Sequence, residues 1–293
     1  MSRRIVVPVN ETPRSERALP IAAHLAQAMD VPLVLLGVRS WLTNDHPVKP
    51  GYHESLLLPY RDIDAESVIV SAGGSIASAI ATTCGPDDIV CMGVDHTSVV
   101  SELVVGSVFF EVIRMFHGPV VAVGPHAAIP IGADRVLICL DGKPHAERGL
   151  DLAEAFAQPA HLVPFLVQAV DAVVSTEAAQ ADVSETGYLH RIAADLAGRS
   201  GADGRSVAPD VGWDVLHGEA VAAIASAASD REVAFVGLAT DAVDPMTRML
   251  SPSLANELVR VCPRPLVLLS ANARVLHRTV IPRRQRALTA VDR

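Results

Sequence analysis

Short, unbroken apolar runs recur along the chain, and stretches with helical spacing separate them. In the first half these runs cover residues 5–9, 31–38, 88–93 and 119–123. Continuous apolar runs of this length are typical of strands that are buried on both faces. Because helical stretches lie between them, the pattern predicts right-handed βαβ crossovers and a parallel sheet that helices cover on both sides.

The second half of the chain repeats the order of the first. The matched blocks, first half before second, are 5–9 and 136–140, Glu16-Arg17-Ala18-Leu19 and Glu147-Arg148-Gly149-Leu150, 31–38 and 160–167, Gly74 and Gly218, 88–93 and 232–237, and 119–123 and 265–269. A repeat of this length predicts two tandem copies of one α/β domain. Each copy should be doubly wound, with a five-stranded, mainly parallel sheet and flanking helices.

The repeat sets the expected domain boundaries at 1–128 and 133–271. The remaining residues, 272–293, form a basic tail with six arginines. Such a tail beyond the last strand is expected to be solvated or frayed, ahead of a partner-binding segment.

The two copies differ most between their second and third strands. In the first copy, residues 39–64 contain three prolines and Gly51, which break helices and predict an irregular segment. Two readings stay open for it, a lid beside the strand ends or a surface excursion. The matching residues 176–199 of the second copy have helical spacing instead.

Composition excludes several classes of protein. Half of the residues are hydrophobic and 4% are aromatic, which excludes disorder, and the net charge of −9 argues against nucleic acid as a partner. No apolar run approaches the ~20 residues of a membrane helix, and no secretory leader is evident. The four cysteines stand far apart without metal-ligand spacing, so we expect a reduced, cytoplasmic protein without a metal site or membrane contact.

Candidate chemistry lies in the loop after the fourth strand. Ligands of doubly wound sheets bind beyond the carboxyl ends of the strands, which selects the loops after Val9, Val38 and Met92. Gly93 ends that fourth strand, and Gly106-Ser107 open the next helix, which is expected over 107–116. A glycine there admits a phosphate to the helix N-terminus, and a serine hydroxyl adds a donor. The alternative is a simple turn and a helix cap.

With the repeat included, these residues resemble the universal stress protein family in its tandem form. The resemblance covers residues 5 to about 270 and implies ATP binding, possibly with Mg²⁺, through a G-x2-G-x9-G-[S/T] motif after the fourth strand. Gly93, Gly106 and Ser107 fill this motif, with Val108 following. The same resemblance implies adenine against Val38 and a pocket lined by Pro8, Val9 and Met92.

Two positions of the first copy depart from the family pattern. His96 replaces the middle glycine, and its side chain either blocks the phosphates or, when protonated, donates a hydrogen bond to them. A loop histidine without a ligand contact is a third reading. Asn10 stands where nucleotide binders of the family have an acidic residue near the ribose, and an amide accepts a weaker hydrogen bond than a carboxylate.

The second copy has a weaker motif. It keeps the acid of the first strand as Asp141, has Val167 in the place of Val38, and keeps Gly237 as the first glycine. Two registers remain for the end of its motif, which becomes Leu250-Ser251 or Pro252-Ser253, and Pro252 would remove an N–H donor. We therefore expect the nucleotide in the first domain and a mainly structural second domain.

The expected function is that of an adenine-nucleotide-binding regulator or sensor in a stress response. The sequence has no nucleophile elbow, G-x-G-x-x-G, G-x-x-x-x-G-K-[S/T] or H-E-x-x-H motif, so we expect no enzyme, or at most slow ATP hydrolysis. The resemblance implies that the halves pair through their last strands and that the chain forms a homodimer. The alternatives are a scaffold that binds no nucleotide, acting through dimer or protein contacts, and an adenylating or pyrophosphatase-type enzyme.

Overall fold

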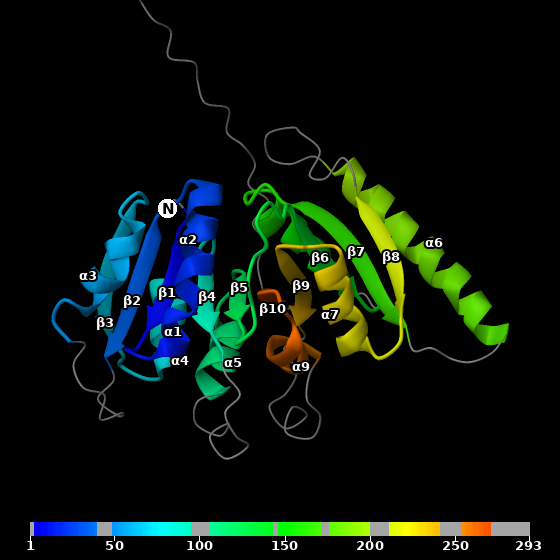
Figure 1. Ribbon diagram of the computed structural model, residues 1–293. Coiled ribbons are helices and arrows are strands. Elements are labelled where there is room, and N and C mark those ends of the chain that lie inside the picture. The colour runs from blue at the N-terminus through cyan, green and yellow to red at the C-terminus, as the bar shows by residue number, and fades with distance from the viewer. Residues whose placement is uncertain are drawn as a thin grey trace, which may run out of the picture.

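A computed structural model of the chain describes residues 3–39, 49–94, 106–142, 146–170, 176–199, 211–240 and 254–270. Ten strands lie side by side in one sheet, and helices cover both of its faces (Figure 1). The predicted fold class, mainly parallel α/β with helices on both sides, is confirmed. None of the helices in these ranges is long and apolar enough to cross a membrane.

The first half supplies five parallel strands. Its elements are β1 (Ile5–Val9), α1 (Pro13–Glu16), α2 (Ala18–Met29), β2 (Leu33–Arg39), α3 (Tyr52–Leu57), the 3-10 turn η1 (Leu58–Tyr60), β3 (Ala65–Ser71), α4 (Ile76–Thr83), β4 (Ile89–Gly93), α5 (Gly106–Met115) and β5 (Val120–Val123). The strand order is β3-β2-β1-β4-β5, with every neighbouring pair parallel. Strand order therefore reverses between β1 and β4.

The second half has the same strand order. Its elements are β6 (Arg135–Leu140), the 3-10 turn η2 (Ala146–Leu150), the π-helical turn η3 (Ala153–Ala157), β7 (Val163–Val170), α6 (Thr176–Gly198), β8 (Gly212–His217), α7 (Ala220–Asp230), β9 (Phe235–Thr240), α9 (Leu254–Val261) and β10 (Leu266–Ser270). The order β8-β7-β6-β9-β10 is again all parallel. The helical stretch expected between the first two strands of this half is wound mainly as η2 and η3, and the Gln158 N–H donates to the Ala153 carbonyl at 2.8 Å.

Alternate residues of each strand enter one of two apolar clusters. On β1, Ile5 and Val7 face the cluster that contains α2, whereas Val6 faces the cluster that contains α4 and α5. In the second half the first cluster includes the Phe156 and Phe235 rings, which meet edge to face at 5.0 Å. Burial on both faces explains why the strands read as continuous apolar runs.

The two halves join through β5 and β10. These strands pair antiparallel, with Val121 opposite Val267, which confirms the predicted pairing of the last strands. Directly after β5, a Cβ on Gly124 would lie 2.1 Å from the Val259 carbonyl oxygen, so a glycine is needed where α9 meets this strand end. The Ala128 N–H adds a hydrogen bond of 3.0 Å to the Pro263 carbonyl.

The segment between β2 and β3 is more regular than expected. Residues 40–48 lie outside the described ranges, but α3 and η1 follow, and their side chains Leu56, Leu57 and Tyr60 pack against the α2-side cluster. Apolar contact with the sheet outweighs the helix-breaking effect of nearby prolines. In the second half, the predicted helix over 176–199 is confirmed as α6.

A buried carboxylate fixes the amino ends of β1 and β4. The Asp88 side chain is 3% exposed and pairs with the Arg4 guanidinium at 2.6 Å. It also accepts hydrogen bonds from the main-chain N–H groups of Arg4 at 3.0 Å and Gly85 at 2.8 Å. Removing the carboxylate would leave all of these donors without their partner.

We expect Asp88→Ala to lower the free energy of unfolding by about 3 kcal/mol, because a partly buried guanidinium and two main-chain N–H groups lose their acceptor. The matched control is Asp134→Ala, since that carboxylate is 74% exposed and lies 3.9 Å from Arg135. The control should change stability by less than about 0.5 kcal/mol. Urea unfolding measures both, and equal midpoints for the two variants would contradict the assigned role of Asp88.

Candidate functional site

The carboxyl ends of β1, β2 and β4 lie side by side where the strand order reverses. Val9 pairs with Gly37, the residue before Val38, and the β1–β4 register continued from the Val6–Val90 pair brings Val9 beside Gly93. The structure therefore brings together the residues predicted from these three strands. Val9 is buried in the α2-side cluster, whereas Pro8, Val38 and Met92 are half-buried.

Asn10 lies at this edge within an internally bonded turn. Its exposed side chain accepts a hydrogen bond from the Thr12 hydroxyl at 2.7 Å, and its main-chain N–H donates to the Ser15 hydroxyl at 3.2 Å. Thr12 in turn caps α1, and Pro13 begins that helix. One carbonyl lone pair of Asn10 is thus already used by the protein, which leaves part of the amide for a ligand.

Gly93 has a packing role that the motif did not suggest. A Cβ at this position would lie 1.8 Å from the Arg14 carbonyl oxygen, because the main chain of α1 rests directly on the end of β4. The glycine is therefore required by a backbone contact within the domain. Neither a tight turn nor a ligand is needed to explain it.

The other motif positions lie at the start of α5. Gly106 and Ser107 are the first two residues of this helix, which begins one residue before the predicted start and ends at Met115. Val108 is half-buried against the cluster of α4 and α5. His96 lies outside the described residues.

Glu11 is a residue of this edge that sequence reasoning missed. Its main chain is left-handed, with φ of 55°, and the second half has Gly142, with φ of 75°, at the same position after its first strand. Its carboxylate accepts the Lys49 N–H at 2.5 Å and lies 3.4 Å from the Lys49 ammonium. A non-glycine residue held in this conformation is a feature of functional or strained sites.

A second contact joins the segment around α3 to the segment that follows β1. The Tyr52 hydroxyl donates a hydrogen bond of 2.7 Å to the Glu16 carboxylate, which links α3 to α1. Burial, together with this hydrogen bond, raises the pKa of Tyr52 above its ordinary value. No local sequence signal pairs residues this far apart, so these contacts become visible only in the fold.

The strand register corrects two matches between the halves. Leu140 corresponds to Val9 and pairs with Gln168, so Gln168 corresponds to Gly37 and Ala169 to Val38. The predicted counterpart Val167 corresponds instead to Leu36 and is fully buried. Sequence matching had displaced this strand by two residues.

The same displacement affects the glycine motif of the second half. Val90 pairs with Val120 in the first half, and Val236 pairs with Leu266 in the second. Counted from these pairs, Ala239 and not Gly237 stands where the first half has Gly93. Counting the same distance along the chain from Ala239 favours Pro252-Ser253 over Leu250-Ser251 as the end of the motif. These four residues lie outside the described ranges. Asp141, the acid of the first strand, is exposed directly after β6.

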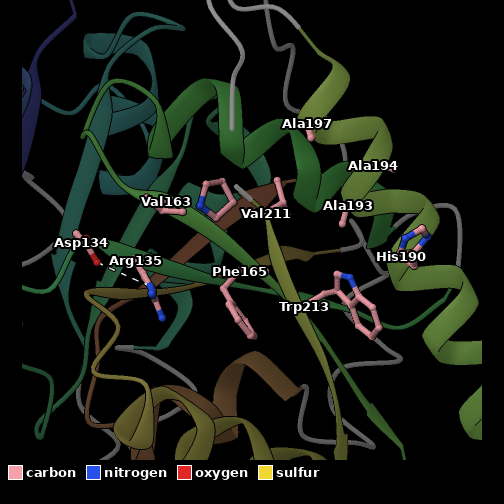
Figure 2. A pocket seen from close by; sticks show the side chains of 12 residues that line it. Asp134, Arg135, Val163, Phe165, His190, Ala193, Ala194, Ala197, Val211 and Trp213 are labelled. Carbon is pink, nitrogen blue, oxygen red and sulfur yellow. Dashed lines mark ion pairs between the residues drawn. The ribbon is translucent and has the colours of Figure 1, made fainter. Parts of the chain in front are cut away.

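A groove of about 680 Å³ lies elsewhere in the second half. It is bounded by α6 and the amino ends of β6, β7 and β8, and Figure 2 shows His190 and Trp213 side by side along it. The two rings meet edge to face, with their centroids 6.2 Å apart. The groove therefore lies at the opposite end of the strands from Asp141. In the described ranges, no three or more His, Cys, Asp or Glu side chains gather as a metal site.

Gly93 and Gly237, a strand glycine in each half, make a pair of variants that separates main-chain from side-chain contact. Gly93→Ala should lower the free energy of unfolding by at least about 2 kcal/mol, because its Cβ meets a main-chain carbonyl. Gly237→Ala should cost less than about 1 kcal/mol, because its nearest neighbour is the end of the Leu152 side chain at 3.0 Å. Thermal or urea unfolding compares them, and equal losses would refute the packing role of Gly93.

The universal stress protein family model matches residues 132–270. Among solved structures, the chain is similar to a universal stress protein from Archaeoglobus fulgidus, with 17% identity, a TM-score of 0.60 and coverage of 92% of this chain and 98% of that chain. A candidate universal stress protein from Pseudomonas aeruginosa has 14% identity and a TM-score of 0.60, covering 92% and 93%.

The cytoplasmic domain of a prokaryotic cation chloride cotransporter is also similar, with 13% identity, a TM-score of 0.52 and coverage of 94% and 98%. No curated protein matches the chain. At these identities the structural likeness concerns the fold, and the family match concerns the second half. Residues 132–270 therefore form a universal stress protein domain, and the first half of the chain carries a second domain of the same fold.

Proposed function

We propose that the first domain binds an adenine nucleotide, ATP with or without Mg²⁺, and that the chain acts as a cytoplasmic regulator or sensor. The observation that carries this proposal is the position of α5. This ten-residue helix begins with Gly106-Ser107 and follows β4, which lies next to β1 where the strand order reverses. Bare N–H groups at such a helix start favour a phosphate.

The remaining residues of the edge fit the other parts of a nucleotide. Val38 and Met92 are half-buried apolar side chains on neighbouring strand ends, suited to a base. Asn10 offers an amide for a ribose hydroxyl, and the Glu11 carboxylate lies beside it at the end of β1. The counterpart in the second domain lacks the glycine of β4 and, in the favoured register, has Pro252 at the helix start.

One observation favours a second candidate function, a scaffold that binds no nucleotide. The Arg14 carbonyl covers the Cα of Gly93, so this glycine is explained without a phosphate. In that case the doubled sheet would serve contacts with a second copy of the chain or with other proteins. Neither candidate requires catalysis, and we propose that any ATP hydrolysis is slow.

Calorimetry with ATP separates the two candidates. We expect one nucleotide per chain for the parent protein and no binding for Gly106→Trp, because an indole at the helix start occupies the place of the phosphates. Pro252→Trp places the same bulk at the position of the second domain that corresponds to Gly106 in the favoured register, and it should leave binding unchanged. If the folded parent gives no heat of ATP binding, the scaffold function is supported. If Gly106→Trp binds ATP as tightly as the parent, the nucleotide binds elsewhere.

Asn10→Asp tests the ribose contact. A carboxylate accepts a stronger hydrogen bond than an amide, so ATP should bind about fivefold more tightly, which corresponds to about 1 kcal/mol. The Thr12 hydroxyl can donate to either side chain, so the turn should be kept. The reverse exchange in the second domain, Asp141→Asn, should leave the affinity unchanged. Weaker ATP binding by Asn10→Asp would contradict the proposed contact between residue 10 and the ribose.

A further inference from the structure

A buried histidine joins α3 to the sheet beside the candidate nucleotide site. The His53 side chain is 2% exposed, and its ring lies against Gly37, where a Cβ would come within 2.9 Å of the ring carbon Cε1. Its Nδ1 lies 2.6 Å from the Ser67 hydroxyl on the edge strand β3, and its Nε2 has no hydrogen-bond partner. Gly37 pairs with Val9, so this niche lies level with the end of β1.

This environment suits a neutral imidazole only. With one proton on Nδ1, the ring donates to Ser67 and leaves only a lone pair unsatisfied at Nε2. A second proton would bury a cation with an N–H that lacks an acceptor, at a high desolvation cost. Burial accordingly lowers the pKa of His53, against the smaller opposing effects of the Glu54 and Glu11 carboxylates. From β2 and β3 the ring meets the uncharged Gly37 and Ser67.

Besides the apolar packing of Leu56, Leu57 and Tyr60, two polar contacts hold the α3 segment, residues 49–60, to α1 and the end of β1. Lys49 binds the Glu11 carboxylate at the end of β1, and Tyr52 binds Glu16 of α1. The Lys49 side chain is 81% exposed, so its ion pair contributes little to docking. Because the His53 ring is the buried side chain of this segment that can take up a charge, its protonation state affects how firmly α3 is docked.

The second domain offers an internal comparison. There the position of Gly37 is taken by Gln168, a residue that is 5% exposed. Because glutamine does not titrate, the second domain has no titratable side chain at this strand position. The two domains thus differ by one titratable ring at equivalent places.

We propose that the α3 segment is a pH-sensitive strap, docked while His53 is neutral and released when the buried imidazole takes up a second proton. Release separates Lys49 from Glu11 and so uncovers a carboxylate at the candidate nucleotide site. The direction of this pH dependence follows because His53 binds the second proton more readily in the released segment than in the docked one. Docking is therefore complete above the ordinary histidine pKa of about 6.5 and weakens as the pH falls below it.

Hydrogen–deuterium exchange of the full chain without nucleotide tests this proposal separately from the proposed function. After correction for the intrinsic effect of pH, the opening of residues 52–57 should increase about tenfold between pH 7.5 and 5.5, the factor for a group with an ordinary pKa of about 6.5 in the released state. Residues 184–198 of α6 should not change. His53→Asn should abolish the increase, and His24→Asn, at an exposed histidine of α2, should keep it.

An unchanged α3 segment in the parent, an equal increase in α6, or an equal increase in His53→Asn would each overturn the proposal. Should His53→Asn fail to fold, imidazole ¹⁵N shifts of the parent decide. We expect His53 to remain neutral at pH 6.5 and the amide signals of residues 52–57 to change together with its titration. A ring that is half-protonated at pH 6.5 with unchanged α3 amides would refute the strap.

Discussion

The antiparallel pairing of β5 with β10 is the constraint on which the architecture depends. Each half-sheet ends in a strand whose free edge would otherwise expose unpaired N–H and C=O groups. Their ladder turns two five-stranded sheets into one sheet of ten strands. At this seam the two last strands run in opposite directions.

The sequence predicts the fold well because its signals are strong and repeated. Aliphatic runs such as 5–9 and 136–140 identify doubly buried strands, and the repeat identifies two copies of one topology. The matches at Val167 and Gly237 were nevertheless displaced by two residues. A strand alternates its faces with a period of two, so this displacement keeps every side chain on its own face. Apolar pattern alone cannot detect such an error, whereas cross-strand hydrogen bonds do.

The candidate site was predictable in its location but not in its detailed contacts. Because the carboxyl ends of parallel strands meet at one edge of a sheet, the sequence predicts that Val38, Met92 and Asn10 lie together. It also predicts that Gly106-Ser107 open the helix after β4. The contact of Arg14 with Gly93 and the tie of Glu11 to Lys49 depend on how α1 and α3 pack, which no local pattern encodes. The same holds for the niche of His53, where a ring from one segment fills the space left by a glycine in another.

The central place of β10 has a consequence for synthesis on the ribosome. β10 is the last of the ten strands along the chain, yet it lies between β5 and β9 in the middle of the sheet. The first domain can complete its own strands early, but the edge of β5 stays open until residues 266–270 emerge. During that interval a nascent chain carries a bare aliphatic strand, which favours pairing with neighbouring nascent chains or chaperones.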